Sequence, residues 1–105
     1  MKIMQFLSVE PMTSRGGNPL ANQQIMSSNL GQMFVSYGTN ICYKSNHRYK
    51  DGDVSRPKYI FDEYYWNYSR TTSKYRNEFL GFGVNECRKG IKEGWIELTN
   101  LNKKK

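Results

Sequence analysis

The element that decides the fold is predicted by the stretch Ser69-Arg70-Thr71-Thr72-Ser73-Lys74-Tyr75-Arg76-Asn77-Glu78-Phe79-Leu80-Gly81. Ser69 is one of the residue types that cap the N-terminus of a helix, and Gly81 is the type that most often follows the last helical residue. Between them, Thr72, Tyr75 and Phe79 recur at the spacing of one buried helix face. We therefore expect a helix from Arg70 to Leu80.

The residues before this helix favour β-structure. Residues 21–27 suit a strand, and Ser28-Asn29-Leu30-Gly31 predicts a turn in which Gly31 takes a positive φ. Residues 32–37 then alternate, with one face made of Met33, Val35 and Tyr37 and the other of Gln32, Phe34 and Ser36. This pattern predicts a β-hairpin, followed by an apolar piece over 41–44 whose type stays open.

The residues after the helix predict a second helix and a closing strand. The second helix is expected over 85–93, with Gly94 as its end, and residues 95–101 alternate as a strand. Together these elements predict the α+β class: a small single domain with an antiparallel sheet of three to four strands and two short helices on one face.

The length of 105 residues sets the domain organisation, because it suffices for one small domain. Turn-forming residues are frequent near the N-terminus, so residues 1–20 are expected to form an arm or loop. The single α+β domain then spans residues 21–102, and residues 103–105 form a basic tail.

The positive charge of the chain is unevenly distributed. The formal net charge is +7, with about +3 in residues 44–60 and about +3 in residues 82–105. Such a field attracts nucleic acid, an anionic membrane or an acidic protein surface. Residues 45–58 are predicted to be an exposed loop or hairpin tip, and the contact candidates in and beside it are Lys44, Arg48, Tyr49, Lys50, Arg56 and Lys58. The alternative is an ordinary hydrophilic hairpin without a ligand.

Aromatic residues are concentrated directly before the first helix. Five of them lie between Phe61 and Tyr68. Bases stack on tyrosine and tryptophan rings while arginine and lysine hold phosphates. This block and the basic positions of the helix are therefore a second candidate contact surface, with Tyr64, Tyr65, Arg70, Lys74 and Arg76. The alternative is a core position, which the spacing favours for Trp66, Tyr75 and Phe79.

Several function classes find no support in the sequence. Cys42, Cys87 and the single His47 match no zinc spacing, so we expect neither a metal nor a cofactor. His47 has no identifiable acid partner for general acid–base catalysis, and we expect no enzyme activity. The apolar run at residues 1–7 is too short for a signal peptide or a membrane span, which favours an intracellular protein without membrane contact.

Three blocks and the C-terminal end of the chain form a recognisable pattern. The blocks are Gly16-Gly17-Asn18-Pro19-Leu20-Ala21-Asn22-Gln23, Phe34-Val35-Ser36-Tyr37 and residues 65–81, and the end is Thr99-Asn100-Leu101-Asn102. They resemble a family of small, uncharacterised bacteriophage and prophage proteins with the motifs GGNPxxNQ, FxSY, YWxYSxTTxKYRxxFLG and TNLN. The resemblance covers residues 16–102, apart from the basic segment 45–58. It implies a phage origin and a domain of unknown function, and it transfers no catalytic residue.

Size, charge and resemblance together favour a phage-encoded binding protein without catalysis. We expect it to act on a host nucleic-acid-handling complex in the cytoplasm of the infected bacterium, as a counter-defence inhibitor of the anti-CRISPR kind that contacts RNA, DNA or an acidic groove of the effector. The basic charge excludes a DNA mimic, because such mimics are acidic. The alternatives are a nucleic-acid-binding accessory protein of phage replication or transcription, and a minor virion component.

Overall fold

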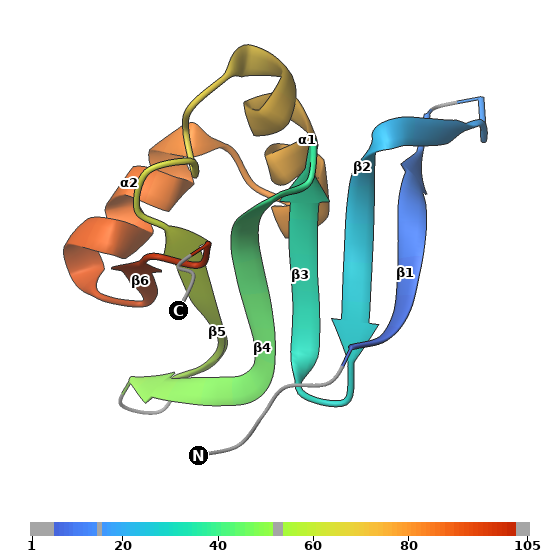
Figure 1. Ribbon diagram of the computed structural model, residues 1–105. Helices are drawn as coiled ribbons and strands as arrows, with labels where there is room; N and C mark the ends of the chain where they lie inside the picture. Colours follow the sequence, from blue (N-terminus) through green and yellow to red (C-terminus); the bar gives the residue numbers. More distant parts are fainter. Residues whose placement is uncertain (1–5, 15, 52–53, 103–105) are drawn as a thin grey trace.

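The chain builds five strands, then two helices, then a last short strand (Figure 1). The computed structural model describes residues 6–14, 16–51 and 54–102, and within them the side chains of 8–14, 16–46 and 58–102. The strands are β1 (Phe6–Thr13), β2 (Pro19–Ser28), β3 (Gly31–Ser36), β4 (Thr39–Asp51), β5 (Val54–Asp62) and β6 (Ile96–Thr99), and the helices are α1 (Arg70–Leu80) and α2 (Val84–Glu93).

All six strands form one sheet, in the order in which they occur along the chain. The strands β1 to β5 are antiparallel neighbours, whereas β6 runs parallel to β5. A parallel neighbour requires a long crossover, and the two helices between β5 and β6 supply it. The predicted antiparallel sheet of three to four strands is therefore wrong, because the sheet has six strands and is mixed.

The additional strands lie where the sequence is polar or rich in turn formers. Residues 6–13, expected to be in an arm or loop, form the edge strand β1, where the missing N–H of Pro11 is tolerated. The segment 45–58 is a hairpin whose pairing continues from Cys42 opposite Phe61 to Asp51 opposite Val54. Backbone groups make these ladders, so a strand forms without the apolar alternation that would reveal it in the sequence. The predicted tail 103–105 lies outside the described residues.

The alternation predicted for residues 32–37 is confirmed over residues 32–36, where the two sets of side chains enter two different cores. It is wrong for Tyr37, which lies in the turn after β3. One core includes Phe34 with the helix residues Leu80 and Cys87, and both helices pack on this face of the sheet. The other core, on the opposite face, includes Met33 and Val35 with the C-terminal Leu101 packed against it. The sheet is thus buried on both faces along its central strands.

The helix α1 begins and ends at the predicted residues. The Ser69 hydroxyl accepts a hydrogen bond from the Thr72 N–H at 3.1 Å, and Gly81 has a φ of 86° with its N–H bonded to the Asn77 carbonyl. The helix α2 starts at Val84, one residue before the predicted start, and ends at Gly94 as expected. Both capping glycines are left-handed, which is the usual way to satisfy the last carbonyls of a helix.

Gly31, in the turn before β3, is required for a different reason from the one predicted. Gly31 does not take a positive φ. Instead, a Cβ at this position would lie 2.6 Å from the Tyr43 hydroxyl oxygen, so the close approach of β4 excludes any larger residue.

The buried carboxylate of Asp62 ties the C-terminus to the segment that precedes α1. Asp62 is 1% exposed, and one of its oxygens accepts hydrogen bonds from the N–H groups of Tyr64 and Tyr65 at 3.1 and 2.8 Å. The other oxygen accepts from the Leu101 N–H at 2.9 Å and the Asn102 amide at 3.0 Å. These contacts orient the tyrosine-rich segment that leads into the helix.

Candidate nucleic-acid interface

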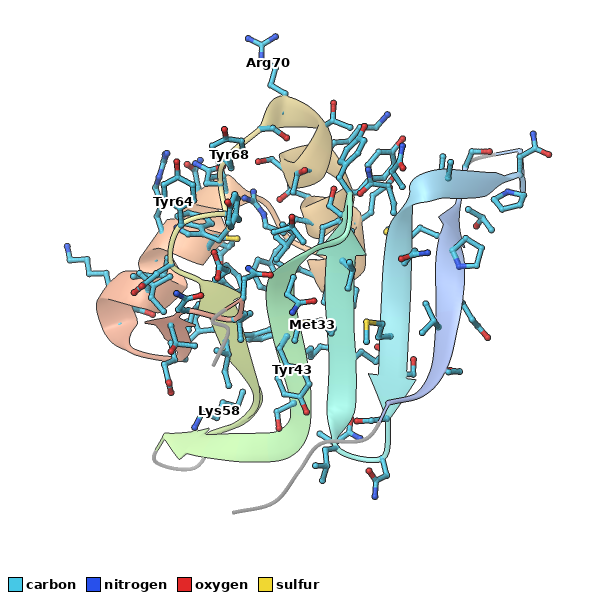
Figure 2. All side chains as sticks on the ribbon, viewed as in Figure 1. Met33, Tyr43, Lys58, Tyr64, Tyr68 and Arg70 are labelled. Atoms are coloured by element: carbon cyan, nitrogen blue, oxygen red, sulfur yellow. The ribbon has the colours of Figure 1, made fainter. Side chains whose placement is uncertain are left out.

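The candidate residues named from the sequence do not form one surface. Figure 2 shows Arg70 projecting at one end of the molecule and Lys58 beside the β4–β5 hairpin, at the other end. Lys58 Nζ lies 3.8 Å from the Glu97 carboxylate, and the Lys44 ammonium lies 5.9 Å from the ring centre of Phe79. The remaining hairpin candidates have side chains outside the described residues, although their backbone belongs to β4 and β5; they are Arg48, Tyr49, Lys50 and Arg56.

The two helices build a pocket of about 520 Å³ whose charged lining is entirely cationic. Arg70, Lys74 and Arg76 come from α1, and Arg88 comes from α2. The polar remainder of the lining includes asparagine and serine side chains, and no carboxylate takes part. We call this site, defined by its four cations, the basic pocket. It brings together Arg70 and Lys74, both named from the sequence as contact candidates, and adds Arg88.

Arg76 differs from the other three cations because it is fully buried, whereas the others are exposed. Its Nη1 donates to the Trp66 carbonyl at 2.6 Å and to the Asn67 side-chain oxygen at 3.2 Å. Its Nη2 donates to the Asn77 side-chain oxygen at 2.8 Å, and the guanidinium lies 5.2 Å from the Trp66 ring centre. The predicted surface position of Arg76 is therefore wrong, because neutral acceptors in the segment before α1 and at Asn77 hold its guanidinium inside the protein.

The charge of Arg76 has no acidic counterpart within ion-pair distance among the described residues. Burial lowers the pKa of its guanidinium, but an arginine in a protein remains protonated at neutral pH. The pocket also contains the start of α1, at Ser69 and Arg70, and the first turn of that helix carries no acidic residue. The positive end of the helix dipole therefore adds to the charge of the arginines.

Three tyrosines with mutual ring contacts lie in the segment that precedes α1, and one of them, Tyr68, lines the basic pocket. Tyr64 and Tyr65 have ring centres 4.7 Å apart, and Tyr68 lies 5.6 and 5.4 Å from them, respectively. Tyr64 and Tyr68 are both 65% exposed, which leaves most of their ring surface free for a ligand. By contrast, Trp66, Tyr75 and Phe79 are partly buried against the main core, as their spacing predicted.

A second, more apolar pocket of about 230 Å³ adjoins the first. Its lining includes Tyr37, Tyr65 and Tyr68 together with the hydroxyl-bearing residues Ser36 and Thr72. We call it the tyrosine pocket. Tyr68 and Ser69 line both pockets, so the two sites are direct neighbours.

Sequence reasoning did not assign Tyr37 and Arg88 to a site. Tyr37 occupies the first position of a two-residue turn between β3 and β4, and its φ is 52°. Both turn residues have a positive φ, and turns of this kind favour Asn-Gly. A tyrosine in place of the asparagine is therefore the sequence feature that could have indicated a functional role for Tyr37. Arg88 carried no such signal, because its place in the pocket depends on how α2 packs beside α1.

The comparisons with known proteins place the chain in a family without assigning an activity. The model of a family of unknown function, DUF8033, matches residues 7–97. The chain belongs to DUF8033. The matched range of this DUF8033 member includes both pockets and every candidate residue named above. Searches among curated proteins and among solved structures each returned no match.

The described residues of this DUF8033 member contain neither a membrane-spanning helix nor a cluster of metal ligands. None of the helices in the described part of the chain has the length and apolar character needed to cross a membrane. Within the same residues, His, Cys, Asp and Glu side chains form no group of three that could hold a metal ion.

The basic pocket offers hydrogen-bond donors and positive charge, and its lining contains no imidazole, thiol or carboxylate to act as a general base. Its arrangement is suited to holding an anion.

Proposed function

We propose that this chain is a non-catalytic nucleic-acid-binding protein that holds phosphates at the basic pocket. The observation that carries the proposal is Arg76, a fully buried cation without a carboxylate partner among the described residues, beside the exposed Arg70, Lys74 and Arg88. A buried charge costs folding free energy, and a bound anion supplies the missing counter-charge.

A phosphate group matches the chemistry of this pocket. Guanidinium groups bind phosphate through two parallel hydrogen bonds, and lysine adds a further point charge. The exposed side chains of Arg70, Lys74 and Arg88 can reach a ligand from solvent, while Arg76 contributes its charge from within the protein, where screening by water is weak. The neighbouring exposed tyrosines favour a nucleic acid over a simple anion, since they offer surfaces on which bases stack.

The biological setting we propose is phage infection. The chain would act on a host nucleic-acid-handling complex in the bacterial cytoplasm, as a counter-defence inhibitor of the anti-CRISPR kind. The support is the resemblance to small phage proteins and the net charge of +7. The second candidate is an accessory protein of phage replication or transcription. The basic pocket favours this candidate, because an accessory protein that binds nucleic acid directly needs no host complex.

Binding to a fluorescently labelled oligonucleotide, followed by anisotropy, tests the role of the pocket. Arg88→Gln should weaken binding about threefold to tenfold and reduce the slope of log affinity against log salt by about 0.7 to 0.9. Lys89→Gln is the matched control, because it removes the same charge from the next residue of α2, which is exposed and outside the pocket. An equal effect of both substitutions would contradict a specific site at the pocket, because it would show that binding depends only on the general surface charge.

Capture of the tagged protein from host lysate, with and without nuclease, tests the setting. A single protein complex retained after nuclease treatment supports the inhibitor. Loss of every partner after nuclease treatment supports the accessory protein and contradicts the inhibitor.

A further inference from the structure

We infer that the tyrosine pocket receives an unpaired nucleobase, next to a phosphate held in the basic pocket, so that the ligand is single-stranded. This inference rests on the proposed function and adds to it the strand type and a second binding site. The two pockets share Tyr68 and Ser69, and neighbouring groups of one nucleotide chain can therefore occupy both.

The lining of the tyrosine pocket suits a base. The rings of Tyr37, Tyr65 and Tyr68 supply flat apolar surface, and Ile41 adds an aliphatic side chain. Every base has an aromatic face, so stacking on tyrosine is available to all of them. In a duplex, the neighbouring base pairs cover these faces, and a base enters a pocket only after it leaves the stack.

Two buried hydroxyl groups give the pocket a polar element. The Ser36 and Thr72 oxygens lie 2.9 Å apart in a hydrogen bond, and both side chains are more than nine-tenths buried. Within the described part of the chain, their side chains form no other hydrogen bond. A hydroxyl group has one donor and two acceptor sites, so the pair retains capacity to bond the edge of a base.

The backbone at Tyr37 is strained, and this strain points to a role of the side chain. Tyr37 has a φ of 52°, in the left-handed region that a residue with a large side chain rarely adopts. Tyr37 is 60% exposed and lines the pocket, so the protein core explains little of its presence. Strained positions of this kind are concentrated at ligand sites. Asparagine would fit this turn better than tyrosine. A ring that stacks on a base at the pocket wall explains why the residue is a tyrosine.

The test compares three ligands of equal length, each of about 12 nucleotides per strand: a thymidine oligonucleotide, its abasic counterpart and the thymidine–adenosine duplex. The abasic oligonucleotide keeps the phosphates and lacks the bases. We expect the single strand to bind at least about tenfold more tightly than either of the others. Tyr37→Asn should remove this advantage and leave the affinity for the abasic oligonucleotide unchanged.

The outcomes separate this inference from the proposed function. Equal affinity for all three ligands, with weaker binding in Arg88→Gln, would overturn the base site and leave the basic pocket in place. An equal loss for the thymidine and abasic ligands in Tyr37→Asn, or no loss for either, would also overturn it. Absence of binding to every oligonucleotide at low salt would contradict the proposed function itself. Circular dichroism of Tyr37→Asn establishes that the variant is folded.

Discussion

Arg76 shows how one buried charge can be held without an ion pair. Its guanidinium is planar and carries donors in fixed directions, and neutral oxygens of Trp66, Asn67 and Asn77 accept from it. Hydrogen bonds to a charged donor are stronger than neutral ones. They reduce the cost of burial and leave the net charge uncompensated, which is the property a binding site for anions requires.

Arg76→Lys should lower the free energy of unfolding by about 1 to 3 kcal/mol, because an ammonium group cannot reproduce the fork of hydrogen bonds. Urea titration measures the change. Arg70→Lys is the matched control, since Arg70 is exposed, and it should shift the free energy by no more than about 0.5 kcal/mol. A stability of Arg76→Lys equal to that of the unmodified chain would mean that the fork contributes nothing to folding.

Tyr37→Asn should raise stability, because asparagine tolerates the left-handed conformation better than tyrosine. We expect a gain of about 0.5 to 1 kcal/mol in the free energy of unfolding, or a few degrees in Tm. Gly38→Ala in the same turn provides a control of opposite sign, with a loss of about 1 kcal/mol, since Gly38 has a φ of 75°. Thermal unfolding measures both. A destabilised Tyr37→Asn would show that the ring supports the fold.

At the scale of the elements, the C-terminal residues Leu101 and Asn102 bind two neighbouring strands at one end of the sheet. The Asn102 side chain accepts from the Asn40 N–H at 2.9 Å and donates to the Asn40 carbonyl at 2.9 Å, and it also donates to Asp62. These bonds join the start of β4 to the end of β5 through residues that follow β6. They give a structural role to the last asparagine of the Thr99–Asn102 pattern.

Asn102→Ala should therefore destabilise the protein by about 2 to 3 kcal/mol, because it leaves the partly buried N–H and carbonyl of Asn40 without these partners and removes one of the four hydrogen bonds to Asp62. Urea unfolding measures the loss. Hydrogen exchange should show faster exchange of the Asn40 N–H, which the substitution deprives of its acceptor. Asn85→Ala, at an exposed position of α2, is the control and should change stability little. Equal effects of the two substitutions would contradict the bridging role.

At the scale of the whole molecule, charge is divided between two distant regions. Lys58 lies near the β4–β5 hairpin and Arg70 at the other end (Figure 2). Lys58, the described cation of the basic segment, is thus separate from the basic pocket. Only the pocket combines cations with exposed aromatic rings among the described side chains.

The core also sets the behaviour of the protein at alkaline pH. Burial raises the pKa of the Cys42 thiol far above its usual range and also raises the pKa of Cys87. In the unfolded chain both thiols ionise near pH 8.5, while the folded protein keeps them protonated. The folded state then binds more protons, and stability should fall as the pH rises above about 8.5, by up to about 1.4 kcal/mol per pH unit for each thiol.

Urea unfolding between about pH 8 and pH 10 measures this slope, below the range in which Tyr43, whose pKa burial also raises, adds to it. The double variant Cys42→Ala with Cys87→Ala should be less stable at neutral pH, because it leaves cavities, and should have a flatter pH dependence. The same slope in both proteins would assign the alkaline loss to other groups.

The sequence alone determined the local elements of this protein. The bounds of α1, the hairpin of β2 and β3 and the opposite directions of Met33 and Phe34 follow from a capping serine, a terminal glycine and an alternation of side chains. Each of these signals acts over a few residues. The same reasoning selected Arg70 and Lys74, which do line one pocket.

Only the tertiary structure decided the rest. The parallel direction of β6, the pairing of β1 and the extension of β4 and β5 depend on backbone contacts between distant segments, and side-chain patterns do not record them. The burial of Arg76 and the presence of Tyr37 and Tyr68 in one pocket likewise depend on how the helices lie on the sheet. A pocket is made of residues far apart in the chain, so its chemistry becomes visible only when the chain is folded.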